Sequence, residues 1–243
     1  MLTHRKLIVY EKAVVLWRDT QARCAGWSRR HAVVDHFRRA SESIVLNIAE
    51  GARLGSAAEK AVKLDYALGS ALECAACLDI LLIKGRLNRD SALTEKRRFL
   101  EITRMLIGLR KAWLQNAISE ESVSYSANTS SATALFHHET LDMYKVGLAF
   151  MHWFVNLPGV SELSDRLCRE MDKTATRAVL NVAEGNGRYS ELDHRRFLEL
   201  AAASAVKTAA YLDLYQQKVL PTRVDTTEGQ EYLARMVAML SRF

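Results

Sequence analysis

The hexapeptide LNIAEG at Leu46–Gly51 returns as LNVAEG at Leu180–Gly185, a shift of 134 residues from position 46 to position 180. The same shift places Tyr10 on Tyr144, and the two copies align without a gap from Tyr10 to the hexapeptide. Because the matching span far exceeds a solenoid repeat, the sequence predicts a tandem duplication of one unit of about 110–120 residues. The shift also pairs Ser56, Ala67, Ser70 and the LD dipeptide at 78–79 with Ser190, Ala201, Ser204 and the LD dipeptide at 212–213.

Composition and periodicity predict helices throughout. The 243 residues include only 2 Pro and 11 Gly, so few residues would break a helix. Tyr10, Val14 and Trp17 recur at i, i+4 and i+7, which gives one apolar helical face. No segment sustains the period-two alternation of a strand. The sequence therefore favours an all-α fold of two tandem antiparallel four-helix bundles.

The predicted helices have recognisable boundaries. Capping-box patterns mark helix starts at SAAE, Ser56–Glu59, at SELD, Ser190–Asp193, and at TEGQ, Thr227–Gln230. The eight helices are expected near residues 7–25, 34–50, 56–84, 94–115, 139–156, 163–184, 190–218 and 228–242.

Three segments follow from this pattern. Residues 1–117 are predicted to form a basic bundle and residues 137–243 a slightly acidic one, while 118–136 is a Ser/Thr-rich linker. No uninterrupted apolar run approaches the roughly 18–20 residues that span a bilayer, so we expect no membrane contact. The N-terminal segment lacks the pattern of a secretory leader, which favours a cytoplasmic protein.

The repeated hexapeptide allows a structural or a catalytic interpretation. Gly51 is suited to the left-handed position after a helix end, and Asn47 to the free carbonyls there. Glu50 would stand at the negative end of the helix dipole, so it needs a cation or donor partner. A catalytic role would require a nucleophile or a poised acid–base pair, and no such constellation is evident. We therefore favour a duplicated structural corner, which comprises Asn47, Glu50 and Gly51 and their counterparts Asn181, Glu184, Gly185 and Arg188.

Cysteine and histidine spacing does not predict a metal site or a cofactor. Cys74 and Cys77 form C-x-x-C inside a helical run, without a second ligand pair, so all four cysteines are expected in the core. A di-metal bundle needs two Glu-x-x-His pairs, and only Glu191–His194 provides one. We expect a non-enzymatic protein that holds no metal and no cofactor.

The charge is unevenly divided. The net charge is +6, with 21 Lys and Arg against 13 Asp and Glu in residues 1–120, and 13 against 15 in the remainder. Clustered Lys and Arg favour a polyanionic partner such as RNA or DNA, and the alternative is an ordinary solvated surface. Arg97, Arg104 and Lys111 are seven residues apart and form one helical stripe. The candidate nucleic-acid-binding residues are Arg29, Arg30, Arg38, Arg39, Arg53, Lys60, Lys63, Lys96, Arg97, Arg98, Arg104, Arg110 and Lys111.

Two segments carry a family resemblance. NVAEGNGRYSELDHRRFLELAAAS and RRASESIVLNIAEGARLGSAAEKAVKLDYALGSALE resemble the signature of the four-helix-bundle proteins encoded by intervening sequences of 23S rRNA genes. The family that the chain resembles also includes the accessory variability determinant of diversity-generating retroelements. The resemblance implies a helical bundle, often in a ring-like pentamer with a basic surface, and no catalytic residues. For the retroelement members it implies binding to nucleic acid and to a reverse transcriptase. It therefore implies a nucleic-acid-binding accessory or scaffold protein, and the alternative is a protein-interaction or self-assembly module that binds no nucleic acid.

The chain departs from this pattern in three ways. It is a fused pair, so whole chains cannot build a five-unit ring, although a homo-oligomer is still expected. Arg53 stands one place earlier in its copy than Arg188, which weakens the case for a shared arginine role. Glu73 of the first copy is replaced by Lys207 in the second.

Overall fold

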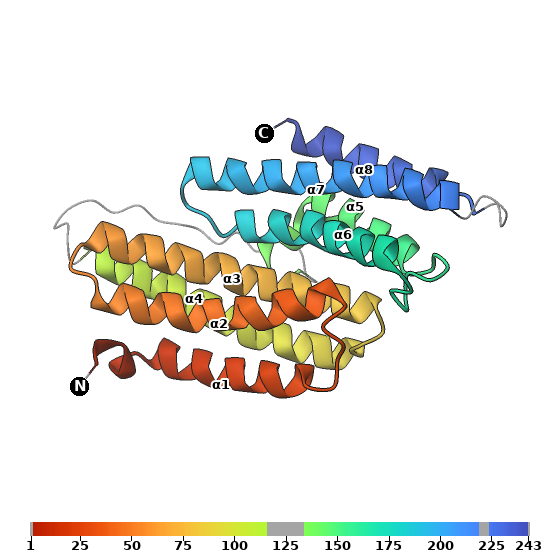
Figure 1. Cartoon of the computed structure of the whole chain (residues 1–243). Coiled ribbons are helices and arrows are strands. Elements are labelled where there is room, and N and C mark those ends of the chain that lie inside the picture. The colour runs from red at the N-terminus through yellow and green to blue at the C-terminus, as the bar shows by residue number, and fades with distance from the viewer. Residues whose placement is uncertain (1, 116–133, 219–223, 243) are drawn as a thin grey trace.

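The structure is a computed structural model that describes residues 2–115, 134–218 and 224–242. Those residues form helices and connecting loops and contain no strand, which confirms the all-α prediction (Figure 1). The first half contains a short 3-10 helix, η1 (Thr3–Lys6), followed by α1 (Ile8–Cys24), α2 (Ala32–Arg53), α3 (Ala57–Ile83) and α4 (Arg89–Gln115). The second half contains η2 (His137–Thr140), α5 (Asp142–Phe154), α6 (Arg166–Gly185), α7 (Glu191–Lys218) and α8 (Thr227–Leu240).

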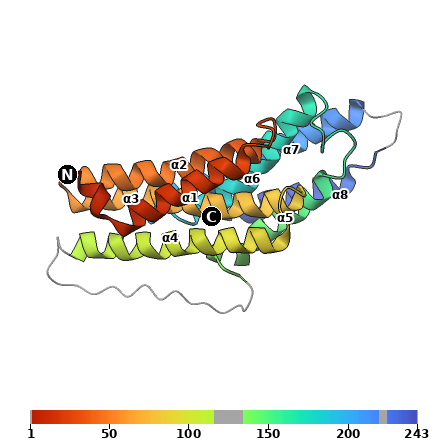
Figure 2. The same ribbon diagram turned by 90° about the horizontal axis from the view of Figure 1, so that it is seen from below.

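The two halves use the same packing order. In the first half α1 packs on α2, α2 on α3, α3 on α4, and α4 returns to α1. In the second half α5, α6, α7 and α8 repeat this closed order, and the two sets lie side by side (Figures 1 and 2). A duplicated four-helix unit would produce this order, while the duplication and the domain boundaries remain predictions. The predicted linker at 118–136 lies largely outside the described residues, and at its described end Phe136 is buried in the core.

Capping side chains begin several helices. Ser56 caps α3 by accepting a hydrogen bond from the Glu59 amide at 3.5 Å, as its capping box predicts. Asp165 caps α6 through the Cys168 amide at 2.9 Å. The capping box predicted at Thr227 is wrong. Thr226 is the N-cap of α8 without a side-chain bond, and Asp225 accepts from the Thr227 amide instead.

Helix α3 is the centre of the molecule. It packs against α2 and α4 of its own half and against α6 of the other half. By length and composition α3 is apolar enough to cross a membrane, a property that a search for one uninterrupted apolar run misses. However, 72% of its most apolar window is buried inside the protein. A helix that is covered on most sides needs apolar residues nearly all round, which accounts for this composition.

The seam between α3 and α6 combines close backbone packing with buried charges. Gly187 lies so near Gly69 that a Cβ atom on Gly187 would stand 2.8 Å from the Gly69 Cα atom. At one end of the seam Asp172 forms a buried ion pair with Lys84. Its carboxylate also accepts a hydrogen bond from the Ala32 amide, 3.0 Å away, at the start of α2. Burial of a charge is costly unless it is paired, so these contacts fix how the halves meet.

A second polar cluster joins α3, α4 and α5. Lys96 pairs with Asp79 at 2.5 Å and with Glu139 at 2.7 Å, and Tyr144 donates its hydroxyl to Asp79 at 2.9 Å. Burial raises the pKa of Asp79, while the Lys96 charge opposes this effect. Lys96 is nearly buried, so it contributes to this cluster rather than to the exposed basic surface that its charge suggested. The sequence gives no sign of this pairing, because Asp79, Glu139 and Tyr144 come from three separate helices, α3, η2 and α5.

The repeated hexapeptide is built differently from the prediction. Helix α2 continues through Gly51 to Arg53, so the prediction of a left-handed glycine after the helix end is wrong. Gly51 instead permits close packing, because a Cβ atom there would lie 3.2 Å from the Lys63 Cβ atom. Asn47 donates to the Ser43 carbonyl and hydroxyl within its own helix, at 2.9 and 3.1 Å, and does not tie the turn.

Candidate nucleic-acid interface

The outer face of α4 carries the predicted basic stripe. Arg97, Arg104 and Lys111 are exposed, and each lies about 10.5 Å along the helix from the next, at 1.5 Å per residue. The opposite face of α4 places Phe99 and Leu106 in the core, so the stripe points away from the bundle. Within the described part of the chain no carboxylate pairs with any of these three side chains. We call Arg97, Arg104 and Lys111 the α4 stripe.

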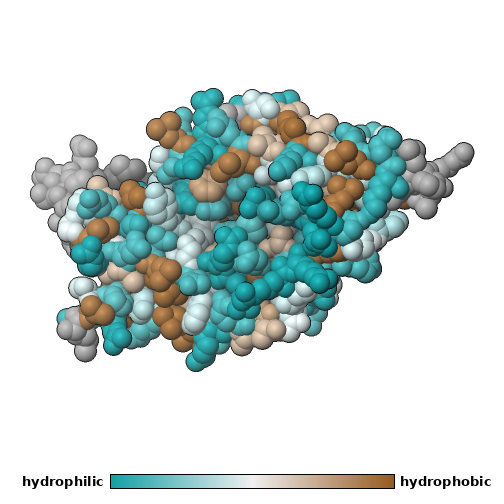
Figure 3. All heavy atoms as spheres, viewed as in Figure 1, coloured by the Kyte–Doolittle hydropathy of each residue, from teal (hydrophilic) through white to brown (hydrophobic). Residues whose placement is uncertain are grey.

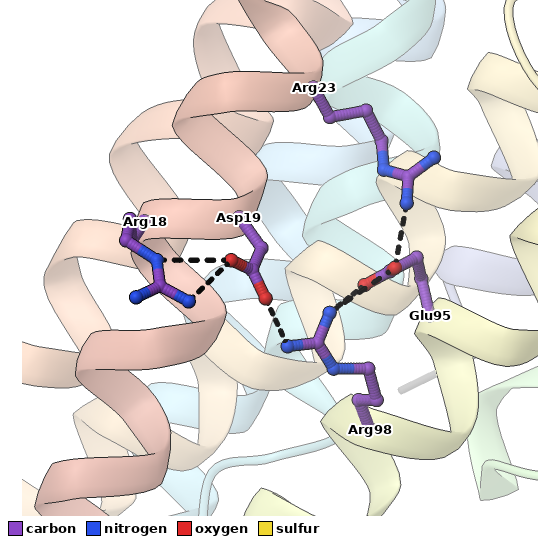
Figure 4. A network of polar contacts seen from close by, with 5 residues as sticks. All are labelled: Arg18, Asp19, Arg23, Glu95 and Arg98. Atoms are coloured by element: carbon purple, nitrogen blue, oxygen red, sulfur yellow. Dashed lines mark hydrogen bonds and ion pairs between the residues drawn. The ribbon is translucent and has the colours of Figure 1, made fainter.

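Arg98, the neighbour of Arg97, has a different environment. Its guanidinium bridges Asp19 of α1 at 2.6 Å and Glu95 of its own helix at 3.0 Å (Figure 4). Arg23 contacts the same Glu95 at 2.8 Å, and Arg18 contacts Asp19 at 3.1 Å. The hydrogen bond from Arg98 lowers the pKa of Asp19. Arg98 therefore joins α1 to α4, and its charge is already balanced by carboxylates.

A shallow hollow of about 350 Å³ lies between α1 and α4, beside the α4 stripe. Val15, Leu16 and Ile102 give it apolar walls, and Lys12 and Glu101 form an ion pair of 2.7 Å at its edge. The hollow thus offers apolar surface and one balanced ion pair beside the part of α4 that lies between Arg97 and Arg104.

More basic side chains stand near the C-terminal end of the stripe. Lys60 of α3 lies over the Trp113 ring, 5.5 Å from its centroid, and Arg53 at the end of α2 is exposed. Lys63 pairs with Glu50 at 2.5 Å, which confirms the expectation that this glutamate has a cationic partner. The partner is a lysine of the next helix rather than the nearby arginine.

The remaining candidates lie elsewhere. Arg29 and Arg30 are exposed in the loop between α1 and α2. Arg38 is half-buried, and Arg39 pairs with Asp35 on its own helix at 2.8 Å. Arg110 belongs to the contact between the halves, because it pairs with Asp65 at 2.6 Å and lies 3.7 Å from the centroid of the Tyr189 ring. The structure brings only part of the predicted set onto one open surface.

The second hexapeptide forms part of the seam. The Glu184 carboxylate accepts from Arg188 at 2.5 Å, and the Arg188 guanidinium lies over the rings of Tyr66 and Phe197, at 4.8 and 4.6 Å from their centroids. Burial, and then the nearby Glu73 charge, raise the pKa of Glu184 to about 7. Arg188 is therefore a buried structural residue that packs against the first half. The sequence showed that Arg188 and Glu184 belong together but not that they face the other unit.

The described residues also bear on metal chemistry and on the cysteines. They contain no group of three or more His, Cys, Asp or Glu side chains arranged to hold a metal ion. All four cysteines are buried and unpaired, which confirms that they are core residues.

The first half matches a family model. It has a four-helix packing order, and its third helix carries a capping serine and is mostly buried. Residues 5–108 match the model of the 23S rRNA-intervening sequence protein family. The matched segment runs from η1 into α4 and includes the hexapeptide at Leu46–Gly51, Arg97 and Arg104.

The family match covers the first half and ends before Lys111. No curated protein matches the chain, and no solved structure does. The family model therefore says nothing of the second half of the chain.

Proposed function

We propose that this protein is a non-enzymatic RNA-binding accessory or scaffold protein whose α4 stripe holds phosphate groups. The observation that carries the proposal is the set of three exposed, regularly spaced cations at Arg97, Arg104 and Lys111, which no described carboxylate balances. The family name, which refers to 23S rRNA, supports RNA as the nucleic acid.

The distribution of charge supports one binding side. Residues 1–120 carry the whole positive excess of the chain, and the remainder has slightly more acidic than basic residues. Lys and Arg that are not neutralised within the protein gain most from replacing the counterions of a phosphate backbone. Arg98 and Arg110 gain less, because binding a phosphate would require each to leave a carboxylate.

The proposal is tested by changing Arg97, Arg104 and Lys111 together to Gln. Affinity for a single-stranded and a structured RNA is measured by fluorescence anisotropy over a salt series. We expect weaker binding and a slope of log affinity against log salt that is shallower by about 2, at roughly 0.7 per phosphate contact on a single strand.

A matched control removes the same charge from the second half. Arg169, Arg177 and Arg196 are exposed and are changed together to Gln. RNA affinity that falls equally in both triple variants would show that net charge, and not the α4 stripe, is responsible. Affinity that does not change with salt would contradict phosphate binding altogether.

We also propose that the protein acts in the cytoplasm alongside a reverse transcriptase or a similar nucleic-acid machine, as the resemblance to the accessory variability determinant implies. The genes adjacent to this one would test the idea, followed by co-purification with the encoded enzyme. Co-purification that survives nuclease treatment would support a direct protein contact. Loss of the enzyme after nuclease treatment would limit the link to shared nucleic acid.

A further inference from the structure

A second hollow lies where the end of α3 meets the second half of the chain, and its volume is about 260 Å³. Drug-sized ligands occupy sites of roughly 300–1,000 Å³, so this hollow fits a smaller molecule. The first half supplies its charged side chains, and the second half supplies apolar walls at Val155 and Val160. Figure 3 shows mostly hydrophilic side chains around the right-hand end of the junction between the halves, where Figure 1 places the starts of α2 and α6. We call this site the α3-end hollow.

A tight turn after α3 fixes the position of Arg86. Gly85 has a φ of +64°, a conformation that glycine adopts at little cost. The Arg86 amide donates to the Leu81 carbonyl at 2.9 Å, and the Gly85 amide donates to the Leu82 carbonyl at 3.0 Å, which closes the helix end. The Arg86 guanidinium then donates to the Nε2 atom of His31, the N-cap residue of α2, at 2.9 Å. Backbone and side chain together therefore hold Arg86 at the hollow.

The α3-end hollow carries one unbalanced positive charge. The buried carboxylate of Asp172 balances Lys84. Arg86 is exposed and pairs with no carboxylate among the described residues. Because a guanidinium can only donate, the Nε2 atom of His31 accepts and the ring is neutral. Burial, and then the Lys84 charge, lower the pKa of His31, which also favours the neutral ring.

His31 has an unpaired hydrogen-bond donor. The residue is only 6% exposed, and its Nδ1 atom is buried without a partner in the described part of the chain. Since Nε2 accepts from Arg86, the proton of the neutral ring is on Nδ1. The Ser161 hydroxyl, also at the hollow, already donates to Glu162, which is exposed to solvent. Buried donors are nearly always paired, so an unpaired donor on a residue that lines a hollow indicates an acceptor from outside the chain.

The internal repeat does not copy this site. The shift of 134 residues places Asp165 at the position of His31 and Lys218 at the position of Lys84. In the second half these two residues form an ion pair with each other. The position of Arg86 is a leucine in the repeat. The unbalanced charge therefore belongs to the end of α3 and is not a property of the repeated unit.

We propose that the α3-end hollow binds a small organic acid. Its carboxylate pairs with the Arg86 guanidinium and accepts a hydrogen bond from His31, and its short apolar part packs against Val155 and Val160. One carboxylate balances the single unbalanced charge, and a guanidinium can donate two parallel hydrogen bonds to it. The site is independent of the α4 stripe. Because its walls come from both halves, the bound acid would also stabilise their contact.

Calorimetric titration with butyrate tests the site, because butyrate combines a carboxylate with a short apolar chain. We expect saturable binding to one site per chain. Butyramide has the same shape without the charge and should not bind. Sodium chloride at the same ionic strength controls for a general salt effect. The NMR signals of the His31 imidazole should shift over the same range of butyrate concentration.

Two variants and a matched control locate the binding. Arg86→Gln removes the unbalanced charge and should weaken butyrate binding about tenfold, the effect of losing a charge-assisted hydrogen bond. Val155→Phe fills the hollow from its half-buried wall and should also weaken binding. Arg89→Gln removes another exposed arginine, which does not line the hollow, and should bind butyrate as the natural protein does. Circular dichroism confirms that each variant is folded, and Arg86 is exposed, so its replacement leaves the core intact.

Three results would overturn the proposal. The first is no binding of butyrate at about 10 mM, ten times the Kd of a millimolar ligand. The second is equal butyrate binding by Arg86→Gln and by the natural protein. The third is displacement of butyrate by single-stranded RNA, which would make the hollow part of the RNA-binding surface. The triple variant of the α4 stripe should bind butyrate normally, so a failure of RNA binding and a failure of this site are distinguishable.

Discussion

The carboxylate of Asp172 is fully buried between the two halves, where it pairs with Lys84 and accepts a hydrogen bond from the Ala32 amide. One side chain of α6 thereby contacts the end of α3 and the start of α2. Replacing Asp172 by Ala leaves the Lys84 ammonium buried without a partner, so we expect the free energy of unfolding to fall by about 3–5 kcal/mol. Denaturant titration measures this. Asp142→Ala is the control. This carboxylate has 82% of its side chain exposed, so its loss should cost less than about 1 kcal/mol. Equal losses in the two variants would contradict the stabilising role of the buried pair between Asp172 and Lys84.

The second prediction concerns Glu184. Its pKa in the folded state is raised from 4.5 to about 7, mainly by burial and then by Glu73, against the opposing charge of Arg188. A raised carboxyl pKa means that the folded state holds the proton more tightly than the unfolded state does. This contribution to stability is complete below pH 4.5 and is lost as the pH rises through about 7. Unfolding at a series of pH values should show the loss in the natural protein.

Glu184→Gln provides the comparison for this pH effect. The variant cannot ionise at this position. As the pH rises from 4.5 to 7, the free energy of unfolding of the natural protein should therefore fall relative to that of the variant. A difference that stays constant over this range would contradict the raised pKa.

Close glycine contacts give a third prediction. A Cβ atom on Gly187 would stand 2.8 Å from the Gly69 Cα atom, and backbone cannot move aside as a flexible side chain can. Gly187→Ala should therefore push α3 and α6 apart and cost about 1–3 kcal/mol. Gly26→Ala is the matched control, because nothing lies within 4 Å of its Cβ position. Thermal unfolding compares the two variants, and similar melting temperatures would contradict the close packing.

The fourth prediction separates Arg98 from its neighbour Arg97. Arg98 balances Asp19 and Glu95, so Arg98→Gln should lower stability by roughly 1 kcal/mol and change RNA affinity less than twofold. Arg97→Gln should do the reverse, with lower RNA affinity and unchanged stability. Anisotropy and denaturant titration on both variants decide the matter. A loss of RNA affinity in Arg98→Gln would return this residue to the binding surface.

Local sequence patterns predicted most of the fold. Sequence patterns located the eight α-helices of the described residues, because most of them bury one face at regular spacing, while the start of α3, which is covered on most sides, was marked by its capping serine. The ends were less accurate. Gly51 suggested a helix end, but the helix continues because the glycine is needed for close packing with Lys63. A glycine at a helix end and a glycine at a helix contact look alike in sequence.

The candidate site was only partly predictable. Seven-residue spacing placed Arg97, Arg104 and Lys111 on one face correctly, since it depends on a single helix. The partners of Lys96 and Arg110 come from other helices and from the other half, so charge alone could not show that these two cations are already paired. The same holds for Asp172, whose burial depends on how the halves meet.

All four cysteines are buried, so their reaction with an alkylating reagent reports when the folded protein opens. Burial raises the pKa of Cys24 to about 11 and raises the pKa of Cys74 and Cys77 well above its usual range, so these three thiols hold little reactive thiolate at neutral pH. Cys74 and Cys77 lie in the middle of α3, the helix shared by both halves. Alkylation kinetics of the unmodified chain would therefore time the exposure of its centre without any added label.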